Sequence, residues 1–168
     1  MHIHRWARAV RHFLALATFV WGGLGLAHAA NPSMLNDFKF DQPTFIHKLP
    51  FAEHKLVLQV SVGEPEYWNL ILNNAQNVLD AFGQEKVRIV IVAYGPGLKM
   101  LLKDSPVAAR IASQNDEGVE FDACHNTMLG MAKKLGHMPE LVPSAVIVPG
   151  GVVRIMQLEK AGFAYIRP

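Results

Sequence analysis

The sequence contains one cysteine in 168 residues and no CxxC pair. One cysteine excludes a disulfide within the chain, and it excludes zinc or iron–sulfur sites built from cysteines alone. Charged residues are also scarce, at 18%, whereas hydrophobic residues make up 51%. This composition excludes a disordered, a collagen-like and a multi-span membrane protein. The length suits one domain with its own core, with or without a leader.

The first 29 residues have the pattern of a leader. Arg5, Arg8 and Arg11 form a basic region, and an uncharged apolar run of 14 residues follows from Phe13 to Leu26. A membrane-spanning helix needs roughly 20 residues, so this run is short for one. Ala27–Ala29 then supplies small residues at the positions that signal peptidase reads. We therefore predict a Sec signal peptide over residues 1–29 and a periplasmic protein, with an uncleaved membrane anchor as the alternative.

Cleavage after Ala29 would change the charge balance of the chain. The 139 residues that follow carry 13 Lys and Arg against 14 Asp and Glu. The basic excess therefore belongs to the leader, so we expect no nucleic-acid partner. We also expect no stable membrane insertion after cleavage.

The part after the leader is predicted to consist of an arm and one domain. The arm, residues 30–53, contains Pro32, Pro43 and Pro50 and has no apolar period. In residues 54–168, short apolar runs alternate with segments of helical spacing, which predicts one α/β domain with a mostly parallel sheet covered on both faces. The predicted strands are Lys55–Val62, Val87–Ala93, Val119–Ala123, Ala145–Val148 and Phe163–Ile166. The predicted helical segments are Pro65–Phe82, Leu98–Lys103, Ser105–Ser113, Asn126–Leu135 and Val152–Ala161.

Three segments carry a family resemblance: Val87–Leu102, Gly118–Leu129 and Val142–Pro168. Their most specific parts are an Ala-Cys-x-Asn-Thr-Met motif and a closing Val-Val-Arg-Ile … Gly-Phe-Ala-Tyr-Ile motif. From about Lys55 to its end the chain resembles the DsrE/DsrF-like family, and most of all a small stand-alone branch that often has a leader. The resemblance implies a three-layer α/β/α fold, here with about five strands, and a homotrimer or homohexamer. In sulfur-relay members it implies a cysteine that carries sulfur as a persulfide, and Cys124 falls at that position. A sulfur donor or acceptor protein, or a small sulfane-sulfur compound, would then be the partner.

Cys124 also stands out on physical grounds. It lies between a predicted strand and a predicted helix, at the sheet edge where open α/β proteins bind ligands. The N-terminus of a helix stabilises a thiolate, which is the reactive form of cysteine. We therefore expect a partly exposed thiol with a lowered pKa, although Asp122 on the same strand face would act against that lowering. A strongly acidic thiol would need a cation such as Arg154, Lys99 or a residue of a neighbouring subunit. The alternative is a buried structural cysteine.

The two residues after the cysteine are further candidates for binding. His125 invites a Cys–His nucleophile, but consecutive residues at a strand end point apart, which favours a solvent-facing or capping role. Asn126 is a suitable cap for the helix that begins there.

A third group of candidates follows the strand Val87–Ala93. Tyr94 is placed to line a pocket or a subunit contact, and Gly95 and Gly97 resemble the glycines of phosphate-binding loops. Neither this segment nor Gly150–Gly151 completes a nucleotide-binding motif, so we expect no cofactor.

A soft-metal site is the remaining alternative for the chemistry. Thiolate and thioether ligands favour Cu(I), and Cys124 and Met128 have i,i+4 spacing. A core-facing helical stripe explains the same methionines better, and no metal-binding spacing is present, so we expect no metal. The candidate ligands are Cys124, Met128, Met131, His137 and Met138, and the competing stripe is Met128, Met131, Ala132 and Leu135.

Three functions follow from these observations. The first is a persulfide carrier or sulfurtransferase that uses Cys124. The second is a non-enzymatic homo-oligomeric binding module, and the third is a soft-metal or redox sensor. We expect a homo-oligomer because long apolar runs and an apolar arm would expose large patches on a monomer. The apolar residues of the arm are Phe38, Phe40, Phe45, Ile46 and Leu49.

Overall fold

The computed structural model describes residues 30–168, so the predicted signal peptide lies outside the described residues. The strands of this part form one five-stranded sheet in the order β4-β3-β2-β1-β5, and every neighbouring pair is parallel. They are β1 (His54–Val60), β2 (Val87–Ala93), β3 (Glu120–Cys124), β4 (Ala145–Val148) and β5 (Ala164–Ile166). The predicted α/β class and parallel sheet are confirmed.

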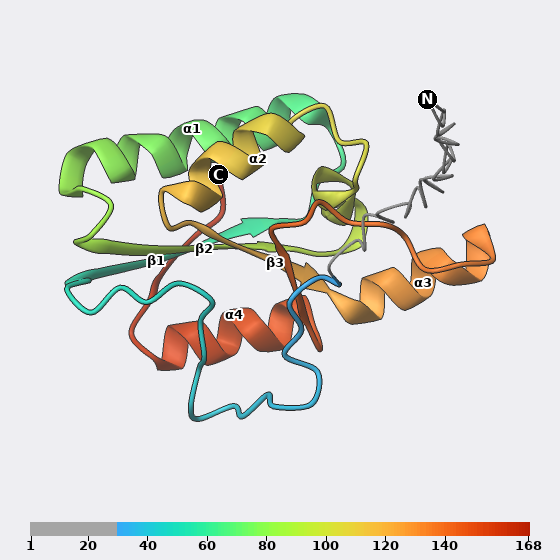
Figure 1. The fold of residues 1–168 in the computed structure, drawn as a ribbon, viewed down its shortest axis with the longest axis horizontal. Coiled ribbons are helices and arrows are strands. Elements are labelled where there is room, and N and C mark those ends of the chain that lie inside the picture. Colours follow the sequence, from blue (N-terminus) through green and yellow to red (C-terminus); the bar gives the residue numbers. More distant parts are fainter. Residues whose placement is uncertain (1–29) are drawn as a thin grey trace, which may run out of the picture.

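Helices cover both faces of the sheet (Figure 1). They are α1 (Pro65–Phe82), the 3-10 helix η1 (Gly95–Leu101), α2 (Ala108–Asp116), α3 (His125–Leu135) and α4 (Gly151–Lys160). Because α1 and α2 lie on one face and α4 on the other, the expected three layers are confirmed. None of the helices within residues 30–168 is long and apolar enough to cross a membrane.

α3 and α4 each begin one residue earlier than predicted, and two other helix starts differ by three residues for local reasons. α2 begins at Ala108 rather than Ser105, because the residues before it form a turn in which the Ala108 N–H donates to Ser105 O at 3.0 Å. η1 begins at Gly95 rather than Leu98, because the Gly97 N–H donates to Tyr94 O at 3.1 Å and starts a 3-10 turn. The Gly-Pro-Gly segment therefore opens this short helix instead of preceding it.

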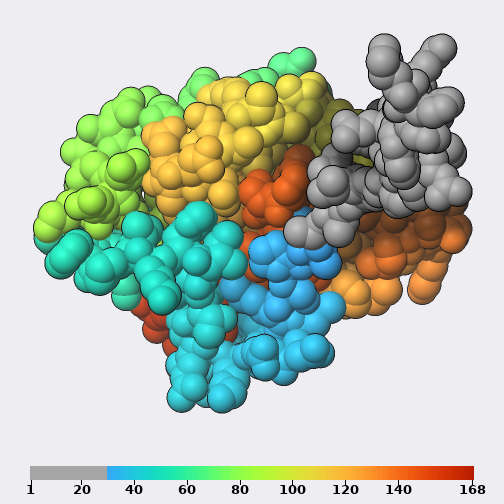
Figure 2. Space-filling model, viewed as in Figure 1, coloured from blue at the N-terminus to red at the C-terminus, as the bar shows by residue number. Residues whose placement is uncertain are grey.

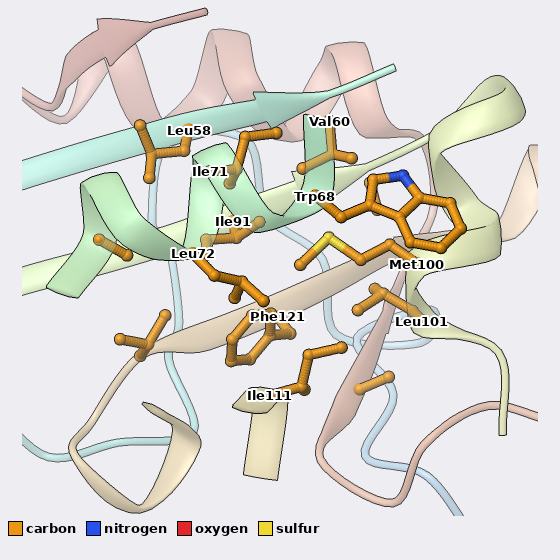
Figure 3. Close-up of a cluster of buried hydrophobic side chains, with 14 of the residues drawn as sticks. Leu58, Val60, Trp68, Ile71, Leu72, Ile91, Met100, Leu101, Ile111 and Phe121 are labelled. Atoms are coloured by element: carbon orange, nitrogen blue, oxygen red, sulfur yellow. The ribbon is translucent and has the colours of Figure 1, made fainter. Parts of the chain in front are cut away.

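The larger core lies between the sheet and the helices α1, η1 and α2 (Figure 3). In it, Leu58, Ile91 and Phe121 of the sheet pack with Ile71 and Leu72 of α1. Burying each of these side chains contributes about 1.5–3 kcal/mol. This core fixes the positions of β1, β2 and β3, and thereby the edge at which Cys124 lies.

The arm runs across the lower front of the molecule (Figure 2) and pairs with the outer edge of β4. The Met34 N–H donates to Ile147 O and the Ile147 N–H donates to Pro32 O, both at 2.8 Å. The arm thus pairs an edge strand that would otherwise offer free backbone groups to another chain. Phe45 stacks on Phe163 with ring centroids 5.7 Å apart. The expectation of a freely exposed apolar arm is therefore wrong, because part of its apolar surface packs on its own chain.

Candidate functional site

Cys124 is the last residue of β3 and the N-cap of α3. It lies at the carboxyl edge of the parallel sheet, as predicted. Its side chain is only 5% exposed, so the expectation of a partly exposed thiol is wrong for this single chain. Cys124 is paired in register with Val148 of β4, on a face that α4 and the arm cover. The sequence pattern gave no sign that the arm folds back onto this face.

Two helix N-termini meet beside the cysteine. α3 begins at His125 and α4 at Gly151, and neither has a side-chain cap or an acidic residue in its first turn. The two ends are close together, because a Cβ added to Gly150 would lie 3.5 Å from Asn126 Nδ2. The free N–H groups of both helices therefore make this edge favourable for negative charge. Asn126 is exposed and does not cap α3, contrary to the prediction, because Cys124 occupies the cap position.

Tyr94 lies against the start of α4. A Cβ added to Gly151 would lie 2.8 Å from the Cβ of Tyr94, so only glycine fits there. Burial raises the pKa of the Tyr94 phenol, and the neighbouring Tyr165 and Cys124 raise it further, while Arg167 lowers it. Tyr94 is therefore an electrostatic neighbour of Cys124, and the structure brings these two predicted residues to the same edge.

The two glycines after Tyr94 have packing roles. The Gly95 N–H donates to Thr127 Oγ1 at 2.9 Å, and its φ of +53° is favourable only for glycine. A Cβ added to Gly97 would lie 2.3 Å from Val60 O. Both residues thus join η1 to its neighbours, β1 and α3, and support the edge that holds Cys124.

A polar chain at the same edge was not indicated by the sequence pattern. The Tyr165 hydroxyl donates to Gln59 Oε1, and Gln59 Nε2 donates to Ser61 Oγ at 3.0 Å. Ser61 also lowers the pKa of the Tyr94 phenol. The two hydrogen bonds link β5 to β1 and to the residue that follows β1. The only signal for it was the presence of polar residues at the ends of otherwise apolar strands.

The side chains considered for a soft-metal site differ widely in burial. Met128 is buried in the larger core, while Leu135 is 50% and Met138 41% exposed. The predicted core stripe is therefore right at Met128 and wrong at Leu135, because α3 runs out past the end of β3 (Figure 1). Within residues 30–168 there is no group of three or more His, Cys, Asp and Glu residues that could hold a metal ion.

A buried charged cluster lies next to the cysteine on β3. Arg154 of α4 is completely buried and donates from Nε to Asp122 Oδ2 and from Nη2 to Glu120 Oε1, both at 2.8 Å. Arg154 is thus paired with carboxylates, and it is not the cationic partner of Cys124 that the sequence suggested. Asp122 accepts its hydrogen bond from the same guanidinium as Glu120 does. The sequence signal for this cluster was the pair of acids, Glu120 and Asp122, at alternate positions of a buried strand.

A cavity of about 690 Å³ lies beside β4, outside this constellation. Met128, four residues after the cysteine, lines it together with Met138, Leu141 and Ile147, whereas Cys124 does not. The cavity therefore adds no group to the candidate site.

No protein-family model and no curated protein matches the chain. Among solved structures, the chain is similar to the protein of unknown function MTH1491 from Methanobacterium thermoautotrophicum. The two share 29% sequence identity with a TM-score of 0.62, over 69% of this chain and 100% of that one. The chain is also similar to the conserved protein of unknown function BT1422 from Bacteroides thetaiotaomicron, with 16% identity and a TM-score of 0.48, over 68% of this chain and 94% of that one.

Proposed function

We propose that the protein is an exported DsrE/DsrF-like sulfur carrier, in which Cys124 holds sulfane sulfur as a persulfide. The observation that carries the proposal is the position of Cys124, which ends β3 and directly precedes α3. Ligands of open α/β sheets bind at this carboxyl edge. The sequence resemblance to the DsrE/DsrF-like family supports the assignment of the cysteine to sulfur chemistry.

The surroundings of the sulfur suit an anion. The N-termini of α3 and α4 lie on either side of it and have no acidic residue in their first turns. One helix N-terminus contributes about 0.3–1 kcal/mol toward a negative charge. Both a thiolate and a persulfide anion on Cys124 would gain from this field. The nearest acid on the strand, Asp122, is held by Arg154.

The loading step is a thiolate–sulfane exchange. The Cys124 thiolate attacks the terminal sulfur of a polysulfide dianion, and a new S–S bond forms on the cysteine. The S–S bond next to that terminal sulfur breaks, and the polysulfide leaves one sulfur shorter with the electron pair. Transfer to an acceptor thiolate repeats the exchange in the other direction. No external oxidant is needed, since the transferred sulfur is already in the sulfane state.

The burial of Cys124 restricts the donor. With 5% of the residue exposed, a bulky donor cannot reach the sulfur of a single closed chain. Inorganic polysulfide is small enough to reach such a site through small local openings. It is therefore the appropriate probe.

The experiment is intact-mass measurement of the native protein after incubation with inorganic polysulfide. Because Cys124 is the only cysteine, an added sulfur atom that dithiothreitol removes can be assigned to it without ambiguity. The nearly isosteric Cys124→Ser variant should gain no mass and keep its fold. Loading of the Ser variant, or a wild-type chain that gains sulfur only in denaturant, would overturn the proposal. The latter result would favour a binding module with an incidental cysteine.

We also propose that the mature protein is a periplasmic homo-oligomer, a trimer or a dimer of trimers. Its support is the group of exposed apolar side chains on the outer face of α4, since such groups mark contact surfaces. They are Val152 (54% exposed), Val153 (43%) and Met156 (54%).

A further inference from the structure

The buried cluster on β3 contains two carboxyl groups and one guanidinium in direct contact. Glu120 and Asp122 are 2% and 0% exposed, and Arg154 is also 0% exposed. Two adjacent carboxylates in a site closed to solvent repel each other and cannot both be ionised cheaply. The hydrogen bonds of the four carboxyl oxygens show how the cluster avoids this repulsion.

Three of the four oxygens accept hydrogen bonds from nitrogen. Glu120 Oε1 accepts from Arg154 Nη2, and Glu120 Oε2 accepts from the Ile46 N–H of the arm, both at 2.8 Å. Asp122 Oδ2 accepts from Arg154 Nε at 2.8 Å. Both oxygens of Glu120 therefore face donors, which is the environment of an ionised carboxylate.

The fourth oxygen, Asp122 Oδ1, is buried and has no nitrogen donor. A buried polar atom without a partner costs about 1–3 kcal/mol. Glu120 Oε1 and Asp122 Oδ2 accept from adjacent nitrogens of the same guanidinium, so the two carboxyl groups lie side by side. A proton on Asp122 would let its carboxyl group donate to Glu120 and would remove the repulsion between the two groups.

We propose that Asp122 and Glu120 form a buried proton-binding site, in which Asp122 is protonated and donates to ionised Glu120, and that this proton holds the arm against the sheet. The cluster then has one negative charge opposite Arg154. Burial and the charge of Glu120 raise the pKa of Asp122 well above its ordinary value, in agreement with this geometry.

The arm depends on this cluster through its backbone. Arg154 Nη2 donates to Thr44 O at 3.0 Å, and the Ile46 N–H donates to Glu120. Arg154 Nη1 also holds Gln157 at 2.6 Å, and Gln157 Nε2 donates to Lys39 O at 2.7 Å. The arm is thus attached at three points to side chains that the cluster orients.

The other charged groups around the cluster are already engaged. Arg88 of β2 donates to His47 O at 2.9 Å and to Leu49 O at 3.4 Å, and lies 4.2 Å from the Phe45 ring centroid. It contributes positive potential at Glu120 without a hydrogen bond to either carboxyl group in the described contacts. The imidazole of His47 contacts Asn115. On β3 the next residue on this face is Cys124. Arg154 is therefore the direct counter-ion of the pair.

The proton makes stability depend on pH with a defined sign. The pKa of Asp122 is higher in the folded chain than in the unfolded chain, so its contribution is fully present below the unfolded value, near 3.8. Between that value and the folded pKa, only the folded state holds the proton. The folding equilibrium constant then falls about tenfold for each unit of rising pH. Above the folded pKa the contribution is lost.

The test compares Asp122→Asn with Glu120→Gln, each of which replaces one of the two carboxyl groups by an amide. In Asp122→Asn, the amide nitrogen replaces the O–H donor to Glu120, and the amide oxygen still accepts from Arg154. In Glu120→Gln, one oxygen is replaced by an NH2 group that faces the donor of Arg154 or Ile46. Urea unfolding of the full chain across pH should show a wild-type minus Asp122→Asn difference that falls with rising pH. A difference that stays flat above the unfolded pKa would overturn the proposal.

Opening of the arm is read out by trypsin at one fixed pH, since Lys39 and Lys48 are exposed on the arm. Cleavage there should be at least tenfold faster in Glu120→Gln and within about twofold of wild type in Asp122→Asn. Equal tolerance of the two variants would contradict the placement of the proton on Asp122. Should Asp122→Asn fail to fold, carboxyl-carbon NMR of wild type labelled in aspartate decides. The proposal requires one aspartate with a carboxylic-acid signal at neutral pH, and the absence of such a signal refutes it.

Discussion

Cys124 is buried at the end of β3, directly before the first turn of α3. Thiolate character and access together decide how fast a cysteine reacts. The N-termini of α3 and α4 lie near Cys124, while its 5% exposure limits access. The size of a reagent should therefore matter more than its intrinsic reactivity.

We predict that native Cys124 reacts with a bulky maleimide at least about tenfold more slowly than the denatured chain does, because reaction requires a local opening. Inorganic polysulfide should still load the native chain. Stopped alkylation followed by intact-mass measurement gives both rates. Equal native and denatured rates for the maleimide would mean that the thiol is open in solution.

The contact between Gly151 and Tyr94 gives a second prediction at this scale. Gly151→Ala places a Cβ 2.8 Å from Tyr94 Cβ, and overpacking of this kind costs about 1–3 kcal/mol. Gly150→Ala is the matched control, because its nearest contact would be an ordinary 3.5 Å. That control should lose only about half a kcal/mol at the N-cap position. Urea unfolding measures both, and equal losses would show that Tyr94 yields to the added methyl group.

The position of Cys124 could be predicted from sequence, but its surroundings could not. A strand followed by a helix with Cys between them is a local pattern, visible in a short window. Cys124 is paired with Val148 of β4, 24 positions away, and the pairing of Arg154 with Asp122 joins residues 32 positions apart. Such long-range contacts leave no local periodicity. The acids at Glu120 and Asp122 were visible, yet nothing nearby in sequence identified their partner.

At the scale of elements, α3 and η1 are joined by one hydrogen bond near the site. The Gly95 N–H at the start of η1 donates to Thr127 Oγ1 in the first turn of α3 at 2.9 Å. Thr127→Val keeps the shape but leaves the Gly95 N–H without its acceptor. We predict a loss of about 1 kcal/mol in unfolding free energy. Thr127→Ser, which keeps the hydroxyl, should lose less. If Val and Ser behave alike, the bond does not stabilise the fold.

The elements with strong local signals could be predicted closely. α1 begins at Pro65 and ends before Gly83, and β2 is a continuous apolar run bounded by turn residues, so both ranges were right. β1 ends at Val60, two residues earlier than predicted, because pairing with β2 ends at Ala93. The ends of strands depend on partners, and their positions are therefore less visible in sequence than helix caps.

At the scale of the whole molecule, the leader pattern predicts where the mature chain begins. Cleavage after Ala29 would leave Ala30 as the first residue, directly before Asn31, whose side chain donates to Val142 O at 2.8 Å. N-terminal sequencing of protein from the periplasmic fraction should begin at or near Ala30. Full-length chain in the inner membrane would instead indicate an uncleaved anchor.

The exposed apolar surface predicts that the whole molecule assembles into an oligomer. Val152, Val153 and Met156 form an apolar group on the outer face of α4, and a contact between copies would bury it. Met156→Glu would place a charge in that contact and should reduce a trimer or hexamer to smaller species by light scattering at micromolar concentration. Phe51→Glu is the matched control, because Phe51 is 64% exposed and belongs to the arm rather than to α4. If the Phe51 variant dissociates and the Met156 variant does not, the contact lies on the arm. A wild-type protein with the mass of a monomer would refute assembly altogether. The burial of Cys124 would then come from its own chain alone.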